Sequence, residues 1–456
     1  DLPGHGVQPN AHWGMIRAPS VILDSTVPLA HHDLTHLTAS AAARLLQRRE
    51  LTAYELLSAC LERIQQREPE ILAWRQYDAK RAMEHARKLD DGPLRGPLHG
   101  LPLGVKDLFD TRDFPSGYGS PIYQHHQPVN DAAAVALCRE AGAIVVGKTV
   151  TTEFATFAPG PTRNPHNCAH TPGGSSSGSA AAVAADMVPL ALGTQTAASV
   201  IRPAAYCGVV GFKPSFGLIP RAGIKSLSES LDTVGGFGRC VEDVALLTSV
   251  LANAPQWRQL SQDAKPRVGV CRTPHWDSAS PAAQQAFEDT VQRLIKAGVW
   301  VVDVTLTDAV SALTEVHDQV MCAEAFKALS DERLNHPDQL SERLKTMLER
   351  GSRVSFEDSL RHRAQVASAR HQMGRGFVDY DLLLTPSACG EAEQGHERTG
   401  DPLFSRIWSM LGLPSLNLPV GFGPQGLPLG VQLIGPVMSD TATLAFCAWI
   451  ERSLKA

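Results

Sequence analysis

An amine and two hydroxyl groups stand at points of the sequence where they could transfer a proton. Lys106 ends a short apolar run that predicts a buried strand, Ser175 lies in the Gly/Ser loop 173–179, and Ser199 closes a polar loop after another apolar run. Loops that follow strands of one sheet can meet at one edge of it. A lysine in an apolar site has its charged form disfavoured, so it can act as a neutral base, and a hydroxyl can relay a proton to it. The pattern predicts a Ser-Ser-Lys relay.

The Gly/Ser loop has further interpretations. A phosphate-binding loop is excluded because no Gly-Lys-Ser or Gly-Lys-Thr follows the glycines. A nucleophile elbow of the form G-x-S-x-G would centre on Ser176, but that motif needs a strand leading into the turn, and 164–167 and 171–172 are turn formers. A surface linker is disfavoured because an apolar, alanine-rich helix follows directly. Ser176 therefore remains the less favoured nucleophile.

Apolar periodicity predicts the elements that must position these residues. Helical spacing covers 37–67, where Thr52 and Glu55 have the spacing of a capping box. Alternating helices and buried strands follow, which is typical of α/β sheets. The predicted strands are 101–105, 143–147, 188–192, 267–271, 411–420 and 427–434, and the predicted helices include 132–140 and 180–186. We therefore expect an α/β/α fold with a mixed, mostly parallel central sheet covered by helices.

Composition and charge exclude several classes of protein. A formal charge of -5 gives no electrostatic reason to expect a nucleic acid or an anionic membrane as partner. No apolar run approaches the roughly 18 residues of a membrane span, and no basic-then-apolar leader is present. The nine cysteines are scattered without a CxxC pair, which favours a reducing, cytoplasmic setting over a disulfide framework or zinc module. Histidines at 31–32, 125–126, 166 and 170 lack an HExxH pattern, so we expect no metal and no cofactor.

Several separated blocks of sequence resemble the amidase signature family. They are 100–107 (GLPLGVKD), 172–185 (PGGSSSGSAAAVAA), 193–199 (GTQTAAS), 207–214 (CGVVGFKP), 230–235 (SLDTVG), 384–386 (LTP), 412–414 (GLP) and 428–435 (PLGVQLIG). Their number and order make chance an inadequate explanation. The resemblance covers roughly residues 35 to 450.

The resemblance implies an amide hydrolase with a Ser-cisSer-Lys triad. Ser199 would be the nucleophile, Ser175 the bridging hydroxyl on a cis peptide, and Lys106 the ultimate base and acid. The backbone N–H groups of Thr196, Ala197, Ala198 and Ser199 would form the oxyanion hole. Glu153 and Asp232 match family blocks and are expected to hold the scaffold of the site by hydrogen bonds. Cys207 is expected to be a buried, inert thiol.

The nucleophile loop departs from the usual family pattern at three places. Gln195 replaces an Asp, and Ala197-Ala198 replace Gly-Gly, so the loop must use backbone conformations open to L-residues. We hypothesise that the neutral Gln195 lowers the Lys106 pKa by removing a nearby negative charge. Arg202 lies three residues after Ser199, where many members have Arg at two.

Gln195 and Arg202 are the candidate substrate-binding residues. Their spacing resembles the malonamidase-like subgroup, in which the matching Arg holds a substrate carboxylate, and a guanidinium suits bidentate capture of an anion. A structural Arg, paired with an acid or with backbone carbonyls, is an equal alternative. The substrate pocket is expected to involve 118–123, 154–162 and 316–348, with Trp408.

The blocks of one site extend over so much of the 456 residues that one oversized domain is expected. Residues 1–30 would be an N-terminal extension, in part a remnant of processing or expression, and 31–456 the amidase domain, with 272–385 a mainly helical excursion on the substrate side. The expected substrates are small amides, with carbamates (urethanes), anilides and activated esters sharing the same carbonyl geometry. A homodimer is compatible with the sequence. The alternatives are the A subunit of glutamine-dependent tRNA amidotransferase, which works with partner subunits, and an esterase that uses Ser176.

Overall fold

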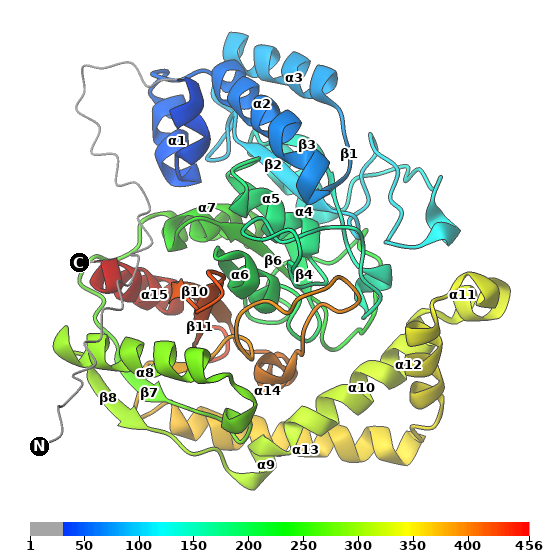
Figure 1. Cartoon of the computed structure of the whole chain (residues 1–456), viewed down its shortest axis with the longest axis vertical. Helices are drawn as coiled ribbons and strands as arrows, with labels where there is room; N and C mark the ends of the chain where they lie inside the picture. Colours follow the sequence, from blue (N-terminus) through cyan, green and yellow to red (C-terminus); the bar gives the residue numbers. More distant parts are fainter. Residues whose placement is uncertain (1–30, 456) are drawn as a thin grey trace, which may run out of the picture.

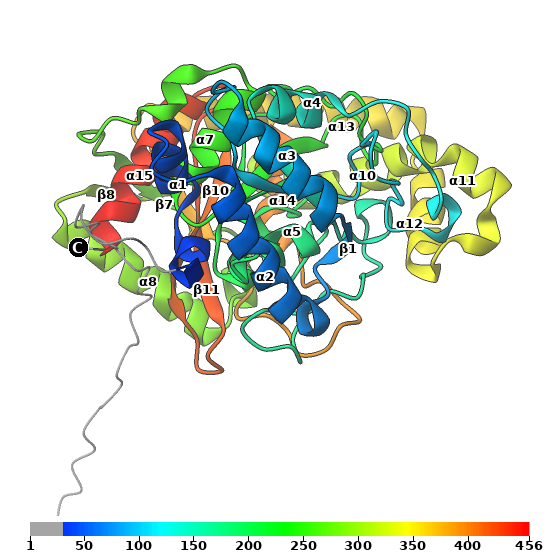
Figure 2. The same cartoon turned by 90° about the horizontal axis from the view of Figure 1, so that it is seen from above.

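A sheet of eleven strands crosses the part of the chain, residues 31–455, that the computed structural model describes (Figures 1 and 2). Its strand order is β1-β3-β2-β4-β6-β5-β10-β11-β9-β7-β8. The strands are β1 (Trp74–Tyr77), β2 (Pro102–Lys106), β3 (Ile144–Thr149), β4 (Leu190–Gln195), β5 (Val210–Lys213), β6 (Thr233–Gly238), β7 (Arg267–Val270), β8 (Trp300–Asp303), β9 (Leu382–Pro386), β10 (Ser415–Phe422) and β11 (Pro428–Ile434). The predicted extension 1–30 lies outside the described residues.

The mixed sheet flanked by helices is confirmed, but its strand directions differ from the mostly parallel arrangement expected. Among the described strands, β2 runs parallel to β3 and β4, and β7 runs parallel to β8 and β9. The other six neighbouring pairs are antiparallel. For one of these pairs the physical reason is local: β10 and β11 form a hairpin through a short turn, and hairpins impose antiparallel pairing.

Helices cover both faces of the sheet. They are α1 (Ala39–Gln47), α2 (Ala53–Ile71), α3 (Ala79–Asp91), α4 (Ala133–Glu140), α5 (Ser177–Ala184), α6 (Ile201–Cys207), α7 (Val241–Leu251), α8 (Pro281–Lys296), α9 (Asp308–Ser311), α10 (Leu313–Ala328), α11 (Ser330–Asn335), α12 (Glu342–Ser352), α13 (Phe356–Gly376), α14 (Leu403–Leu411) and α15 (Asp440–Lys455). In Figure 1, α1–α3 lie at the opposite end of the molecule from α9–α13. The excursion 272–385 holds α8–α13 and also contributes β8 to the sheet edge.

Strand β5 shows how the two faces are divided. Val210 and Phe212 pack in one hydrophobic cluster with residues of α7, α8 and α15. A side chain at the alternate position, Gly211, would collide with Ala204 of α6 at 2.7 Å. Because successive strand residues face opposite sides, α6 lies on the other face from α7.

The first long helix begins as predicted. Thr52 accepts a hydrogen bond from the N–H of Glu55, and the Glu55 carboxylate accepts one from the N–H of Thr52, which completes the capping box.

None of the helices within residues 31–455 combines the length and apolarity needed to span a bilayer.

A buried lysine at the end of β5 gives the fold a pH-dependent stability. Lys213 is fully buried, and its ammonium donates to the carbonyl of Pro214. Burial lowers the pKa of Lys213 from 10.5 to about 7, against an opposing effect of Asp440.

Stability should therefore rise with pH above about 7, and Lys213→Met should remove this gain. Above pH 7 the folded chain has released a proton that the unfolded chain holds up to about pH 10.5. The free energy of unfolding then rises by up to about 1.4 kcal/mol per pH unit in that window. Unfolding midpoints of both proteins between pH 7 and 9.5 should diverge in favour of the wild type. Parallel curves would show that Lys213 is not neutral in the folded state.

Candidate active site

Lys106 is the last residue of β2 and is enclosed by hydroxyl and carbonyl groups. Its Nζ lies 2.7 Å from Ser175 Oγ, 2.7 Å from Thr194 Oγ1 and 3.4 Å from the Thr194 carbonyl. The side chain is 0% exposed, and no carboxylate lies within 4 Å of it among the described residues. Burial lowers the pKa of Lys106 well below its usual 10.5, and the more distant Asp232 opposes this only in part. A neutral amine is therefore the favoured form.

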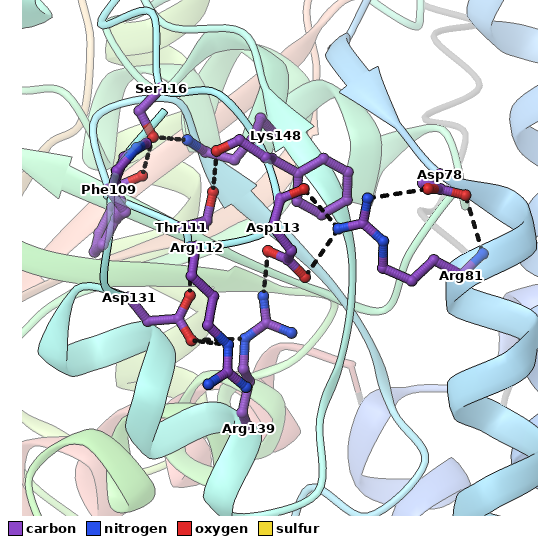
Figure 3. Close-up of polar contacts among 12 residues, drawn as sticks. Asp78, Arg81, Phe109, Thr111, Arg112, Asp113, Ser116, Asp131, Arg139 and Lys148 are labelled. Carbon is purple, nitrogen blue, oxygen red and sulfur yellow. Dashed lines mark hydrogen bonds and ion pairs between the residues drawn. The ribbon is translucent and has the colours of Figure 1, made fainter. Parts of the chain in front are cut away.

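A second buried lysine, Lys148 on the adjacent strand β3, makes an instructive contrast. Its Nζ forms an ion pair with Asp107 at 2.9 Å and donates to Ser116 Oγ at 2.7 Å. Figure 3 shows Lys148 directed at Ser116, whose hydroxyl in turn donates to the carbonyl of Phe109. Lys148 has a carboxylate partner and Lys106 has none among residues 31–455, so Lys148 anchors the loop after β2 while Lys106 is available for proton transfer.

Surface charges hold the outer part of that loop. Asp113 accepts from Arg139 at 2.7 Å and pairs with Arg81, and Arg139 also pairs with Asp131 at 3.2 Å (Figure 3). Together with the Lys148 contacts, these pairs tie the segment after Lys106 to α3 and α4.

Ser175 follows a cis peptide bond and lies two residues before the first residue of α5. The bond Gly174–Ser175 is cis, and the Ser175 hydroxyl accepts from Lys106. The neighbouring chains approach closely: a Cβ on Gly178 would lie 2.4 Å from the nitrogen of Val150, so only glycine fits there. The N–H of Ser176 donates to the carbonyl of Ser199 at 3.3 Å. The small-residue segment thus brings the Ser175 loop against the Ser199 loop, as its composition predicts.

Ser199 lies just before α6 in a loop fixed by Gln195. The Gln195 Oε1 accepts from the N–H groups of Val200 and Ile201 at 2.9 and 3.0 Å, and its Nε2 donates to Ser409 at 3.0 Å. Gln195 therefore caps the start of α6 and does not line the cavity beside Ser199. The Ser199 hydroxyl makes no hydrogen bond within the described residues, so none joins it to Ser175 Oγ.

The backbone beside Ser199 presents unpaired donors. The N–H groups of Ala197, Ala198 and Ser199 donate to no acceptor in the described part of the chain. Neither alanine has a positive φ, which agrees with the expectation that the loop uses conformations open to L-residues. Such a row of donors can stabilise a developing oxyanion.

Residues remote in sequence hold this loop in place. Ser409 donates to the carbonyl of Ala197 at 2.7 Å, and His317 Nε2 donates to the carbonyl of Thr196 at 3.0 Å. Burial lowers the pKa of His317 to about 3, so the ring is neutral. Thr196 Oγ1 donates to Asp232 at 2.6 Å, and Asp232 also accepts from the N–H of Ser228.

The expected scaffold role of the acidic residues is confirmed. Asp232 links two loops of the site, as described, and Glu153 accepts from the N–H and hydroxyl of Ser341, which begins α12. Neither carboxylate contacts Lys106.

A cavity of about 20 Å³, which we call the catalytic cavity, adjoins Ser199. Its lining residues are Ala155, Thr156, Phe157, Thr196, Ala197, Ala198, Ser199, Arg202, Leu227, Met321, Met347 and Pro402. Two of the three predicted segments, 154–162 and 316–348, contribute to it. The third, 118–123, does not, and Trp408 is wholly buried and does not line it. A cavity of this size holds about one water, so a substrate must be small or must displace the flexible methionines.

Arg202 lines this cavity and carries hydrogen-bond donors that have no partner among the described residues. Its Nη2 donates to the carbonyl of Gly174 at 2.8 Å and to Thr399 Oγ1 at 3.1 Å. Its Nε and Nη1 are buried without a partner among the described residues, although the residue is only 3% exposed. Nη2 thus binds neighbouring groups of the protein, whereas Nε and Nη1 remain available to donate hydrogen bonds to an anion.

Three residues are excluded from the chemistry by their contacts. Ser176 Oγ donates to the carbonyl of Thr194 and accepts from its N–H, and no strand leads into its turn, so the elbow interpretation is wrong. Cys207 is buried with a raised pKa, as expected of an inert thiol. His166 Nε2 contacts the carbonyl of Cys207.

Sequence reasoning missed several residues of the site. Thr194 is not among the predicted site residues, although its position in the 193–199 block, near the end of β4, is a signal for it. His317, Thr399 and Ser409 lie outside every recognised block and give no local signal.

Comparison with known proteins shows the family to which the chain belongs. The family model described as Amidase matches residues 55–444. The A subunit of glutamyl-tRNA(Gln) amidotransferase from Carboxydothermus hydrogenoformans is 31% identical over 92% of this chain and 98% of its own length. A crystal structure of an amidase superposes with a TM-score of 0.84 at 31% identity, covering 91% of this chain and 99% of that one. The peptide amidase of Stenotrophomonas maltophilia gives a TM-score of 0.79 at 28% identity, over 92% and 97% of the two chains.

The chain therefore belongs to the amidase signature family. It is a hydrolase of the class that acts on C–N bonds.

Proposed function

We propose that this protein hydrolyses small amides that carry a carboxylate close to the scissile carbonyl, through an acyl-enzyme on Ser199. The observation that carries the proposal is that Arg202, which lines the same cavity as Ser199, has two buried nitrogens without a partner among the described residues. A buried cation with free donors has a strong need for an anion, because leaving such groups unpaired costs free energy.

In the proposed reaction, Ser199 Oγ attacks the amide carbonyl. When substrate binds, the Ser199 hydroxyl turns to donate to Ser175 Oγ. Its proton then passes to Ser175 Oγ while the Ser175 proton passes to the neutral amine of Lys106. The free N–H groups of Ala197, Ala198 and Ser199 stabilise the oxyanion. The C–N bond then breaks, and the protonated Lys106 returns a proton through Ser175 to the leaving amine.

Deacylation repeats these steps with water. Water attacks the ester on Ser199, its proton moves through Ser175 to Lys106, and the tetrahedral intermediate collapses to a carboxylic acid. Ser199 regains its proton through the same relay. Carbamates and anilides meet the same requirements, since the relay recognises a trigonal carbonyl and a protonatable leaving group.

A hydrolysis panel tests the substrate class. It compares malonamate with the neutral butyramide, and adds an anilide and a carbamate. We expect the highest kcat/KM for malonamate. Arg202→Met should lower the ratio of kcat/KM for malonamate over butyramide by about 10- to 150-fold, the equivalent of one charged hydrogen bond of about 1.5–3 kcal/mol.

The ratio, rather than the activity, decides the outcome, because Arg202 also holds Gly174. Arg406 is the matched control: it is a largely buried arginine that pairs with Asp318 and does not line the catalytic cavity. Arg406→Met should leave the ratio unchanged. If Arg202→Met lowers both substrates equally, Arg202 is structural and the proposed substrate class is wrong.

The A subunit of a tRNA amidotransferase is the second candidate function. Curated relatives of this kind support it, at 31% identity in Carboxydothermus hydrogenoformans and 33% in Symbiobacterium thermophilum. Gln195 and the position of Arg202 weigh against it. An assay of the purified protein distinguishes the two functions. Amide hydrolysis with no other protein added would favour the hydrolase, and activity only with partner subunits would favour the amidotransferase.

A further inference from the structure

A second cavity lies between α10 and α13, in the helical region 313–376. Its volume is about 350 Å³, which is within the range of sites for small organic ligands and well above the catalytic cavity. Val320 and Ala323 of α10 face Val366 and Ala367 of α13, and Met410 of α14 adds to the apolar wall. We call it the α10–α13 cavity.

The polar groups of this cavity are mainly cationic. Lys327, Arg363 and Arg370 line it, against the single carboxylate of Glu324. Neither Lys327 nor Arg363 has an ion-pair partner within 4 Å in the described part of the chain. The Glu324 oxygens already accept hydrogen bonds from Ser228 and Ser230. Lys327, Arg363 and Arg370 are exposed, and Arg370 donates to the carbonyls of Met410 and Leu411. The excess positive charge therefore lies on the side of the cavity that is open to solvent.

A buried histidine, His362 of α13, also lines the cavity. His362 of α13 is 4% exposed, and its Nδ1 has no hydrogen-bond partner among the described residues. Burial lowers the pKa of His362, which favours the neutral ring. Buried polar atoms in native proteins nearly always have a hydrogen-bond partner. A polar atom of a bound ligand could supply the partner that His362 lacks.

The α10–α13 cavity is separate from the catalytic cavity. The two have no lining residue in common. Helix α10 divides them: it presents Val320 and Ala323 to one and Met321 to the other. A ligand of the α10–α13 cavity would therefore not be the substrate under attack by Ser199.

We propose that the α10–α13 cavity is a second small-molecule site that binds an organic monoanion with an apolar body, such as an arylalkyl carboxylate or sulfonate. The apolar walls take the body of the ligand, Lys327 and Arg363 face its charge, and His362 offers a hydrogen bond. This assignment does not depend on the reaction proposed for Ser199.

Equilibrium binding of 8-anilinonaphthalene-1-sulfonate, followed by its fluorescence, tests the proposal. The full chain should bind the dye saturably at one site. 4-Phenylbutyrate should displace it, and the neutral 4-phenylbutanol should do so at least about tenfold more weakly, because it lacks the charge that the cations attract.

Two pairs of variants locate the site. Ala367→Trp fills the cavity and should raise the dye Kd at least about tenfold, whereas Ala364→Trp, on the same helix but outside the lining, should not. Arg363→Gln should raise the Kd about three- to tenfold, and less so at high salt. Arg375→Gln is its control, twelve residues or about 18 Å further along α13.

Unfolding midpoints establish that each variant is folded. If Ala367→Trp is unstable, the dye Kd of Arg363→Gln still tests whether the dye binds in the α10–α13 cavity. A dye Kd unaffected by Ala367→Trp and Arg363→Gln would place the dye elsewhere and overturn the proposal. Equal displacement by 4-phenylbutyrate and 4-phenylbutanol would show an apolar surface without anion recognition, which also overturns it.

Discussion

Ser199→Ala is expected to lower kcat/KM for amide hydrolysis by about 10⁴-fold or more and to abolish covalent labelling by a fluorophosphonate. The proposed reaction passes through an ester on Ser199 Oγ, and losing a nucleophile costs an enzyme nearly all of its chemical advantage. The free N–H groups at 197–199 remain in the variant, so a small residual rate over water should persist. Hydrolysis assays and mass spectrometry of the labelled protein measure both effects.

Ser176→Ala is the matched control for this prediction. It also removes a buried serine hydroxyl, one that contacts only the backbone of Thr194 in the described structure. We expect it to cost about 1 kcal/mol of stability and to leave labelling intact. Labelling that survives in Ser199→Ala and disappears in Ser176→Ala would reverse the assignment of the nucleophile.

The residues closest to the chemistry could be predicted because they lie in short, contiguous segments. Lys106 ends an apolar strand, and Ser175 and Ser199 lie in loops whose small residues permit close contact. Gly178, which would collide with the backbone of Val150 if it had a side chain, shows that this composition has a geometric cause. The fold class followed from the alternation of helices and strands.

The remainder could not be predicted because it depends on contacts between distant parts of the chain. Ser409 donates a hydrogen bond to the carbonyl of Ala197, 212 residues earlier in the chain. Thr399 accepts a hydrogen bond from Arg202, 197 residues earlier. Serine and threonine are common, and nothing in their neighbourhood shows which of them returns to the site. The prediction of mostly parallel strands was wrong for a related reason. An apolar run of strand length does not reveal the direction in which that strand enters the sheet.

Two roles are open to Arg202, a structural one and a substrate-binding one, and the sequence alone does not distinguish them. The structural interpretation required backbone carbonyls, and Gly174 supplies one. The ligand interpretation required free donors, and Nε and Nη1 supply them. A single guanidinium satisfies both, so the choice between them has to be made by substrate selectivity.

Lys106→Met is expected to lower kcat by about 10²- to 10⁴-fold, the usual range for loss of a general acid and base. The methionine fills the buried space without an amine to accept the proton from Ser175. Lys148→Met is the comparison, because Lys148 is equally buried on the neighbouring strand but pairs with Asp107. That variant should lose stability, since Asp107 is left as an unpaired buried carboxylate, and should keep a larger share of kcat when folded. Equal losses of kcat in the two variants would show that Lys106 serves only the structure.

The pH profile separates a neutral base from a structural lysine. Only the unprotonated Lys106 can accept a proton, so kcat/KM should rise with pH through its pKa and then level off. Burial places that pKa well below 10.5, and the rise should therefore occur far below the pH at which an exposed lysine titrates. Gln195→Asp introduces a negative charge near the site, which favours the protonated amine and should shift the rise to higher pH. A rise that stays in place in Gln195→Asp would show that the neutral residue at 195 does not tune Lys106, and a rise that persists in Lys106→Met would assign the titrating group elsewhere.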